Sequence, residues 1–419
     1  MAGSNDNGIV NVVHPICCGL DVHKEKISAC LISSSVFGGT YTEVQEFGTF
    51  TDELMRLRDW LLKNDCPIVA MESTGIYWRP VHNVLEGYVE VILVNARHIK
   101  NVPGRKTDIC DSKWLGGLLR HGLLRGSFIP PKEVREWRDL TRLRRTYVET
   151  LGDYKRRTHK LFESANIKID SVVSDLFGQT GRNLMRLLGQ GSFPIRQEDM
   201  EGCLRGKLKA KREELYRSVQ GFFTDHHGYL LHSLLKTIAT IEGEIEAIND
   251  RLRQVMKNHE SLLRMLMEVA GISEVSARGI LSEAGSTMDP FRTSAALCSW
   301  AGVCPGNNES AGKRHSGKSP VRKHHLKTIM VEVAWAAVKV KGSYYREKYY
   351  RLKARRGARR AIVGIAHRLL KAVYHIIKDG VPFKDPGEDF LNRANGLQNK
   401  VRRLRNQAHQ LGYALVAQI

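Results

Sequence analysis

The chain has 419 residues, of which 65 are Lys or Arg and 44 are Asp or Glu, so its formal net charge is +21. Hydrophobic residues make up 42% and charged residues 26%, which is typical of globular domains and excludes a wholly disordered chain. No apolar run reaches the roughly 18 residues of a membrane span, and the N-terminus lacks the layout of a secretory signal. We therefore expect a cytoplasmic protein of two or three domains that does not enter a membrane.

Residues 1–130 predict a mixed α/β domain. Residues 16–22 and 26–34 read as strands joined by a tight turn, and residues 42–50 as the third strand of a meander. A helix is predicted to start at Thr51, whose side chain we expect to cap it. The following elements are predicted to be a strand, a helix and a strand, at residues 67–72, 74–85 and 89–94. Three meandering strands followed by alternating helix and strand are the layout of a ribonuclease H-like domain.

Long helices are predicted in a second domain, residues 131–261. Apolar residues recur there at alternating spacings of three and four, which is typical of a coiled coil. The spacing fits a hairpin within one chain and a seam between two chains equally well. The two stripes are Trp137, Leu140, Arg144, Tyr147, Leu151, Tyr154, Thr158 and Leu161, and then Leu231, Leu234, Ile238, Ile241, Ile245, Ile248, Leu252 and Val255.

A third, mostly helical domain is predicted at residues 262–383, followed by a helical tail at 384–419. Its segment Val269-Ala-Gly-Ile272 resembles the turn of a helix-hairpin-helix, in which a glycine lets backbone N–H groups approach a phosphate. A glycine packed between two core helices would have the same sequence pattern, so both interpretations remain open.

Most of the positive charge lies in one stretch of this domain. Residues 310–371 contain 18 Lys and Arg but only two acids, so they carry +16 of the net +21. Such a one-sided segment repels itself unless a polyanion is present, and tyrosines within it could stack on bases. We therefore favour nucleic-acid binding over a merely solvated helix. The candidate phosphate-binding residues are Lys313, Arg314, Lys318, Arg322, Lys323, Lys327, Arg355, Arg356, Arg359 and Arg360.

Four acids of the first domain are candidates for a metal site. Asp21 and Glu72 end predicted strands, and Asp108 and Asp111 are spaced so that a helix places both on one face. In a ribonuclease H-like sheet these positions converge, and the clustered carboxylates would repel one another without cations. Their hard oxygen atoms suit Mg²⁺ or Mn²⁺, and two such ions could promote phosphodiester cleavage.

Several motifs resemble those of the DEDD-type insertion-sequence transposases, the Piv-like recombinases guided by a bridge RNA. In the first domain they are Gly19-Leu-Asp-Val-His-Lys24, Met71-Glu-Ser-Thr-Gly-Ile-Tyr-Trp78 and Lys106-Thr-Asp-x-x-Asp111. Those that resemble the family's second conserved domain are Val269-Ala-Gly-Ile272, Phe291, Trp300-Ala-Gly-Val-x-Pro305 and Glu309-Ser-Ala-Gly-Lys313.

The resemblance implies a RuvC-like nuclease domain joined by a coiled coil to a transposase domain. It implies that four carboxylates bind Mg²⁺ or Mn²⁺: Asp21, Glu72, Asp108 and Asp111. It also implies that a serine, Ser310 by its place in the motif, attacks a DNA phosphate and forms a covalent 5′-phosphoserine link. The sequence departs from the family pattern at Ala311, where a glycine is expected, and Ser316 is the second candidate nucleophile.

The partners that the resemblance implies are donor and target double-stranded DNA, a structured bridge RNA that acts as guide, and further copies of the chain in a homo-oligomer. A serine hydroxyl is a weak nucleophile that needs a base or a metal, which the carboxylates of the first domain could supply. The cell compartment implied is a prokaryotic cytoplasm, at the nucleoid.

Two other functions remain as alternatives. An actin-like or sugar-kinase-like ATPase also carries a Gly-x-Asp motif on its first strand, as Gly19 and Asp21 do here, but it predicts a second Gly-rich phosphate loop that this sequence lacks. The other alternative is a nucleic-acid-binding scaffold whose metal site is inactive.

Overall fold

A computed structural model describes most of the chain, in two compact units formed by Met1–Ile129 and Pro130–Ile419. The described residues are 11–34, 39–73, 75–95, 111–191, 193–305, 308–310, 313–316, 324–388, 390, 401–402, 404–414 and 416. Among the helices within these ranges, none combines the length and hydropathy of a membrane-spanning segment.

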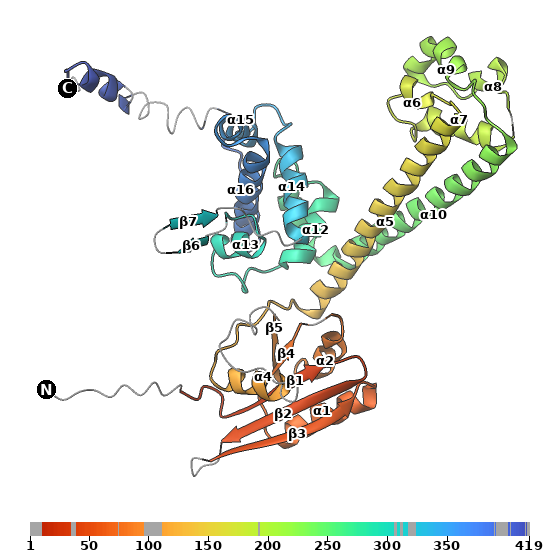
Figure 1. Ribbon diagram of the computed structural model, residues 1–419. Coiled ribbons are helices and arrows are strands. Elements are labelled where there is room, and N and C mark those ends of the chain that lie inside the picture. Colours follow the sequence, from red (N-terminus) through yellow and green to blue (C-terminus); the bar gives the residue numbers. More distant parts are fainter. Residues whose placement is uncertain are drawn as a thin grey trace. The chain divides into compact units, whose positions relative to one another are not determined.

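The first unit is built on a five-stranded sheet, coloured red to orange in Figure 1. Its strand order is β3-β2-β1-β4-β5, in which β1, β2 and β3 are antiparallel neighbours and β4 and β5 run parallel to β1. This is the ribonuclease H-like arrangement, so the predicted mixed sheet is confirmed. The strands are β1 (Ile16–Val22), β2 (Lys26–Ser34), β3 (Thr40–Gly48), β4 (Ile68–Glu72) and β5 (Glu90–Val94).

Helices cover both faces of this sheet. One face packs against α1 and α2 through strand residues such as Leu20 and Met71. The opposite face packs against Leu115 and its neighbours on α4, through residues of the other parity such as Cys17 and Ala70. The three helices are α1 (Thr51–Lys63), α2 (Trp78–Leu85) and α4 (Asp111–Arg120).

One predicted helix cap and one predicted helix start in this unit are wrong. Thr51 is the first residue of α1 and not its cap, because Phe50 occupies the N-cap position and no side chain caps the helix there. The backbone N–H of Gly48 instead donates to Glu53 Oε2 at 3.0 Å, which ties the first turn of α1 to β3. The start of α2 is Trp78 rather than residue 74, since Gly75 has φ +58° and cannot continue a right-handed helix.

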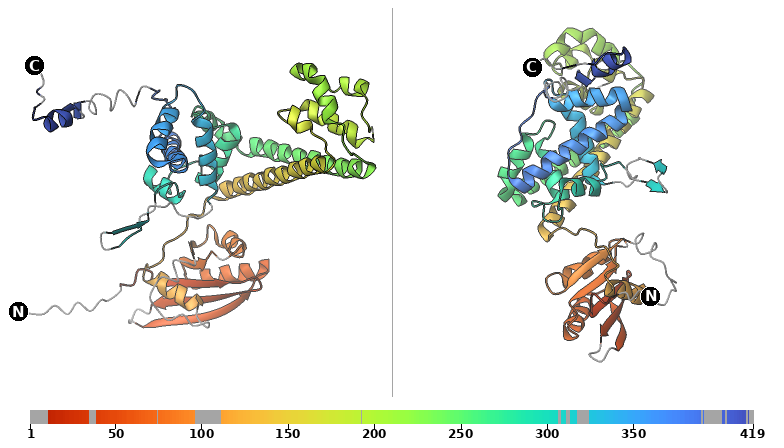
Figure 2. Two further views of the ribbon diagram at one scale, coloured as in Figure 1. Left: turned by 45° about the horizontal axis from the view of Figure 1, so that its top comes forward. Right: turned by 90° about the vertical axis from the view of Figure 1, so that its left-hand side faces the viewer.

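In the second unit, α5 (Lys132–Ser164) and α10 (Asp225–Val255) form a long helical hairpin (Figures 1 and 2). The pairing is antiparallel, because Arg144 Nε donates to Asn249 Oδ1 at 2.6 Å while Lys155 lies 3.9 Å from Glu242. All eight residues of the second predicted stripe, from Leu231 to Val255, are buried or half-buried. The helices therefore pair within one chain, which the sequence left open.

Short helices cover the far end of this hairpin around a core that includes Leu184 and Leu215. Arg182 fixes them to α10 through two hydrogen bonds to the carboxylate of Glu242, at 3.0 and 2.6 Å. The helix α7, which contributes Arg182, ends at Gly189. These elements are α6 (Ile169–Val172), α7 (Gln179–Gly189), α8 (Gln197–Glu201), η1 (Gly206–Lys211) and α9 (Arg212–Ser218).

The rest of the second unit packs around α16, whose apolar residues are buried along its length. A two-stranded hairpin, β6 (Asn308–Ser310) and β7 (Lys313–Ser316), lies between α13 and α14 in the sequence. Of the predicted helical tail, the structure describes residues 404–410 as helix. The helices are η2 (Lys257–His259), α11 (Glu260–Met267), α12 (Glu274–Ala284), α13 (Ser294–Trp300), α14 (His325–Ala337), α15 (Tyr344–Arg356) and α16 (Ala358–Asp379).

The turn between α11 and α12 is the predicted helix-hairpin-helix segment. Gly271 in this turn has φ +86°, and a Cβ atom on it would lie 2.5 Å from both Val333 O and Ala337 N of α14. The glycine is therefore required by the close packing of the turn against α14. Of the two interpretations of this motif, the structure favours core packing over phosphate binding.

Candidate active site

Asp21 and Glu72 lie at one end of the sheet, on neighbouring strands. β1 and β4 are paired in parallel register with Leu20 beside Met71, and Asp21 and Glu72 are the next residues of the two strands. Because successive side chains alternate between faces, both carboxylates are on the face that α4 covers.

The start of α4 is held against the same end of β1 by a very close approach of the two backbones. A Cβ atom on Gly19 would lie 2.0 Å from Ser112 O and 2.4 Å from Gly116 N. A Cβ atom on Gly116 would lie 3.4 Å from Gly19 N. Only a strand residue without a side chain permits α4 to cross β1 at this distance.

A polar contact joins the first turn of α4 to β2 beside Asp21. Ser28 lies directly opposite Asp21 in the β1–β2 ladder, and its Oγ is 3.2 Å from Ser112 Oγ. Asp111 is the residue before Ser112 and the first residue of α4. Asp21, Glu72 and Asp111 are thus placed at one end of one face of the sheet.

His23 adds a contact to this group. Its Nε2 lies 3.0 Å from Asp21 Oδ2, while the Asp21 side chain is 29% exposed. An imidazole in this position can orient one oxygen of the carboxylate and leave the other for a ligand. His23 belongs to the first of the sequence motifs, but the spacing of residues in that motif does not indicate that its side chain contacts Asp21.

The fourth predicted ligand, Asp108, lies outside the described residues. Among the described residues, no three His, Cys, Asp or Glu side chains form a group that could hold a metal ion. The carboxylates of Asp21, Glu72 and Asp111 nevertheless supply only hard oxygen donors, the kind that Mg²⁺ and Mn²⁺ prefer. The donor set fits such an ion in its chemistry and in its place on the fold.

The two candidate serines lie on the β6–β7 hairpin. Ser310 is the last residue of β6 and pairs with Lys313, whereas Ser316 is the last residue of β7 and pairs with Asn308. The ladder is irregular between Asn308 and Glu309, so that one extra residue of β7 is accommodated there. Ser310 is therefore at the turn end of the hairpin and Ser316 is at its base.

The described members of the predicted phosphate-binding set are distributed over four elements. Lys313 and Arg314 belong to β7, and Lys327 belongs to the first turn of α14. Arginines end α15 and begin α16, on either side of Gly357, and are exposed: Arg355, Arg356, Arg359 and Arg360. The other three candidates, Lys318, Arg322 and Lys323, lie outside the described residues.

Aromatic rings accompany these cations on α14 and α15. Trp335 and Tyr350 are 42% and 50% exposed, and Tyr349 lies in contact with both of them. Arg346 and Lys353 lie over the Tyr350 ring at 5.7 and 5.9 Å from its centre. Exposed aromatic faces flanked by cations are suited to unpaired bases.

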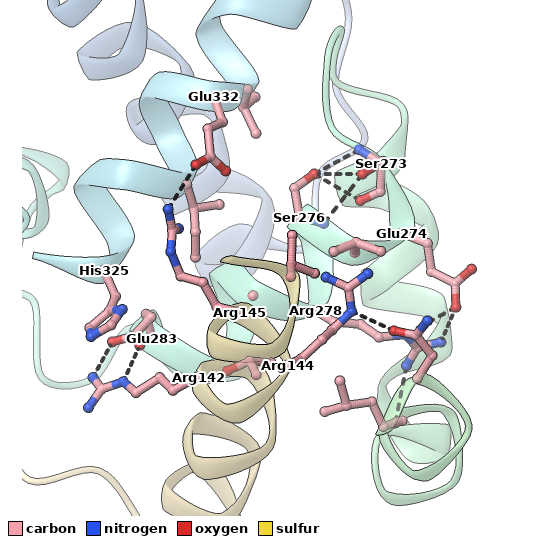
Figure 3. Close-up of a pocket in the computed structure, with 18 of the residues that line it drawn as sticks. Arg142, Arg144, Arg145, Ser273, Glu274, Ser276, Arg278, Glu283, His325 and Glu332 are labelled. Atoms are coloured by element: carbon pink, nitrogen blue, oxygen red, sulfur yellow. Dashed lines mark hydrogen bonds and ion pairs between the residues drawn. The ribbon is translucent and has the colours of Figure 1, made fainter. Parts of the chain in front are cut away.

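A cavity of about 400 Å³ lies where α5 and α10 meet α12 and α14 (Figure 3). Arg142 donates to both oxygens of the buried Glu283 at 2.9 and 3.0 Å, and Arg145 contacts Glu332 at 3.1 Å. Burial lowers the pKa of His325, and the neighbouring Arg142 lowers it further. Because its arginines are matched by carboxylates, we interpret this site as the joint that fixes the hairpin to α12 and α14.

A ribonuclease H-like sheet with carboxylates at the end of its central strands defines a class of nucleic-acid-cleaving enzymes. Residues 18–167 match the DEDD transposase family of IS110, described as "Transposase". Residues 263–351 match the family described as "Transposase IS116/IS110/IS902 family". The two matches together span more than half of the chain, and the chain belongs to the IS110-type transposases. It is a DNA-cleaving transposase or recombinase.

Among solved structures, the chain is similar to that titled "Thermus thermophilus RuvC structure". The identity is 12%, the similarity covers 27% of this chain and 99% of that chain, and the TM-score is 0.22. The curated proteins gave no match.

The close approach of α4 to β1 predicts that a single methyl group added at Gly19 displaces α4. Gly19→Ala should shift α4, lower the stability by about 1–3 kcal/mol and reduce DNA cleavage strongly, because the new Cβ collides with backbone atoms of Ser112 and Gly116. The matched control is Gly117→Ala in α4, where a Cβ atom meets nothing within 4 Å. It should keep full cleavage and gain up to about 1 kcal/mol of stability. Thermal unfolding and a cleavage assay check both variants, and wild-type cleavage by Gly19→Ala would contradict the placement of α4.

Proposed function

We propose that this transposase uses Ser310 as its nucleophile, together with divalent metal bound by Asp21, Glu72, Asp108 and Asp111, and that a structured RNA guides it. The observation that carries the proposal is the placement of Asp21, Glu72 and the start of α4 at one end of one sheet face. Carboxylates that approach one another at this end of the sheet would cost electrostatic energy unless they serve to bind cations.

The chain's own residues have distinct tasks in this proposal. Asp21 and Glu72 are held by two paired central strands, and His23 orients the Asp21 carboxylate. A bound Mg²⁺ or Mn²⁺ ion would stabilise the negative charge that develops on a phosphate under attack. The same residues would form an inert site in the scaffold alternative, so catalysis must be tested apart from binding.

The metal site predicts a selective loss in Asp21→Asn. Loss of one carboxylate should weaken binding of Mg²⁺ or Mn²⁺ about tenfold or more and should stop strand cleavage, while DNA binding persists. Glu90→Gln is the control, because Glu90 is exposed and begins β5 at the opposite end of the sheet. Isothermal titration with each ion and a cellular transposition assay measure both effects. An unchanged transposition frequency in Asp21→Asn would favour the scaffold.

The strand-cleaving step balances without an external energy source. The Ser310 oxygen would form a bond to phosphorus, the bond from phosphorus to the 3′ oxygen would break, and the strand would keep a free 3′-hydroxyl. The hydroxyl proton of Ser310 would pass to a base and then to the leaving oxygen. Because the phosphodiester energy is kept in the 5′-phosphoserine bond, a 3′-hydroxyl from another strand can reverse the step and complete the exchange.

Covalent trapping distinguishes the two candidate serines. Ser310→Ala should bind DNA with wild-type affinity but form no protein–DNA adduct, whereas Ser316→Ala, its matched control on the same hairpin, should still form one. The substrate is labelled at the 3′ end, because the fragment with the 5′-phosphate stays attached to the protein. Denaturing gel electrophoresis detects the adduct. If Ser316→Ala alone abolishes the adduct, the nucleophile is Ser316 and the assignment of Ser310 is wrong.

The basic and aromatic surfaces of α14–α16 support DNA and RNA as partners. Phosphate contacts supply affinity, and stacking on exposed rings such as Trp335 and Tyr350 suits the unpaired bases of a folded RNA.

Assembly into a homo-oligomer is part of the proposal as well. Leu143 and Val148 on α5 are 44% and 42% exposed, and they leave apolar surface on the hairpin for another chain.

The RNA partner predicts a discrete species in purified protein. RNA that co-purifies with the full chain should be dominated by one structured transcript encoded beside the gene. Replacing the four arginines around Gly357 with glutamine should reduce the amount recovered, because these side chains are exposed and cationic. Sequencing of the bound RNA measures both results. Recovery of bulk cellular RNA alone would contradict the guide.

A further inference from the structure

The turn that leads from β4 to α2 exposes two large apolar side chains. Ile76 and Tyr77 are 62% and 42% exposed, and they follow Glu72, the last residue of β4, by four and five residues. Five residues span at most about 18 Å, so the Cα atom of Tyr77 cannot lie farther than this from that of Glu72. The two side chains are therefore neighbours of the candidate metal site.

Backbone contacts fix the start of this turn at one edge of the sheet. Because β1, β4 and β5 are parallel, the register places Asp21, Glu72 and Val94 level with one another. The N–H of Ser73 donates to Val94 O at 2.8 Å, which continues the pairing of β4 with β5. Gly75 then adopts φ +58°, and the chain turns toward α2. The turn thus begins at the edge that carries the carboxylates.

The chain crosses this edge from one face of the sheet to the other. The carboxylates are on the face that α4 covers, whereas α2 packs on the opposite face through Val81 and Leu85. Trp78, the first residue of α2, is half-buried against the same core. Ile76 and Tyr77 precede Trp78, so they lie between the two faces, where the chain passes over the end of the sheet.

The Tyr77 ring packs beside the backbone of this turn. A Cβ atom added to Gly75 would lie 3.6 Å from Cδ2 and 3.7 Å from Cε2 of the ring, which is ordinary contact distance. The N–H of Arg79 donates to Ile76 O at 3.1 Å and closes the turn that carries both apolar side chains. A ring whose position is restricted in advance loses less conformational entropy when a ligand stacks on it.

We propose that Tyr77 and Ile76 bind one base of the DNA strand that is cleaved, and thereby hold the scissile phosphate at the proposed metal site. Tyr77 would stack on the face of the base, and Ile76 would pack against its edge. Every base has a face on which an aromatic ring can stack, so the contact would add affinity without strong sequence preference. The base has to leave the stack of the duplex, and stacking on Tyr77 would offset part of that cost. The proposal rests on the metal site proposed above and adds the residues that hold the strand there.

A substrate that lacks one base tests this contact. Tyr77→Ala should slow strand cleavage by about 5- to 100-fold, the loss expected when one base loses its stacking partner, whereas Tyr77→Phe keeps the ring and should retain the wild-type rate. An abasic site at the contacted position should slow the wild-type protein by the same factor. Tyr77→Ala should be insensitive to that abasic site, because ring and base share one interaction. Cleavage rates are measured with the full-length protein and its co-purified RNA, as the abasic site is moved along the strand.

An exposed tyrosine at the other end of the sheet is the matched control. Tyr41 is 60% exposed and pairs with Ser33, which in turn pairs with Ile16, the first residue of β1. Tyr41→Ala should therefore cleave at the wild-type rate. If the losses caused by Tyr77→Ala and by the abasic site add at every position, the ring contacts no base and the proposal is wrong. Equal slowing by Tyr41→Ala would contradict it as well.

Metal binding and stability distinguish this contact from a structural role. Tyr77→Ala should bind Mg²⁺ with wild-type affinity in isothermal titration and should melt at the wild-type temperature, because the side chain is partly exposed and is not a proposed ligand. Weaker Mg²⁺ binding or a lower melting temperature, with equal loss on intact and abasic substrates, would overturn the proposal. Full cleavage by Asp21→Asn would instead show that the proposed metal site fails. Cleavage that Asp21→Asn abolishes and Tyr77→Ala leaves intact would exclude only the base contact.

Discussion

The contact on which the candidate active site depends is the crossing of α4 over β1 at Gly19. Two backbones meet there at a distance that no side chain on the strand would allow, with Gly116 on the facing turn of the helix. The crossing sets the height of α4 above the sheet and brings the start of this helix, where Asp111 lies, to the β1 strand that carries Asp21. A small shift of this helix would separate ligands that must converge within a few ångströms to share a cation. The geometry of the carboxylates is thus a consequence of packing that involves no charge.

The first domain was largely predictable because its signals are local. Short apolar runs bounded by turn residues indicate the strands, and the position of Asp21 and Glu72 at strand ends follows from the topology. The predicted start of α2 is wrong because the backbone conformation of one residue sets it. Gly75 has a left-handed φ, so the helix begins only after it. Pairing within one chain or between two gives the same heptad stripe, so the sequence could not identify α5 and α10 as partners. Gly271 shows the same limit, because a phosphate loop and a packed turn require the same residue.

Composition alone also concealed two different environments for arginine. At the joint of α5, α12 and α14, arginines such as Arg142 are matched by buried or half-buried carboxylates and hold helices together. At the junction of α15 and α16, by contrast, the arginines on either side of Gly357 are exposed: Arg355, Arg356, Arg359 and Arg360. The paired arginines are neutralised within the protein, whereas the exposed ones leave positive charge at its surface. The difference between these two groups of arginines depends on whether a carboxylate lies beside the guanidinium, and this can be seen only in the folded chain.

The two parts of the proposed chemistry are held by elements of unequal stability. Asp21 and Glu72 belong to paired central strands whose apolar residues are buried on both faces, so their backbones cannot shift without disrupting a core. Ser310 belongs to a hairpin of three and four residues that forms its own two-stranded sheet. Such a hairpin is marginally stable by itself and gains most of its stability from what packs on it. Nucleic acid bound to the cations of β7 and α14–α16 would supply that contact. In this proposal, placement of the serine would depend on the substrate, whereas the strands that carry Asp21 and Glu72 are fixed by the core of the sheet.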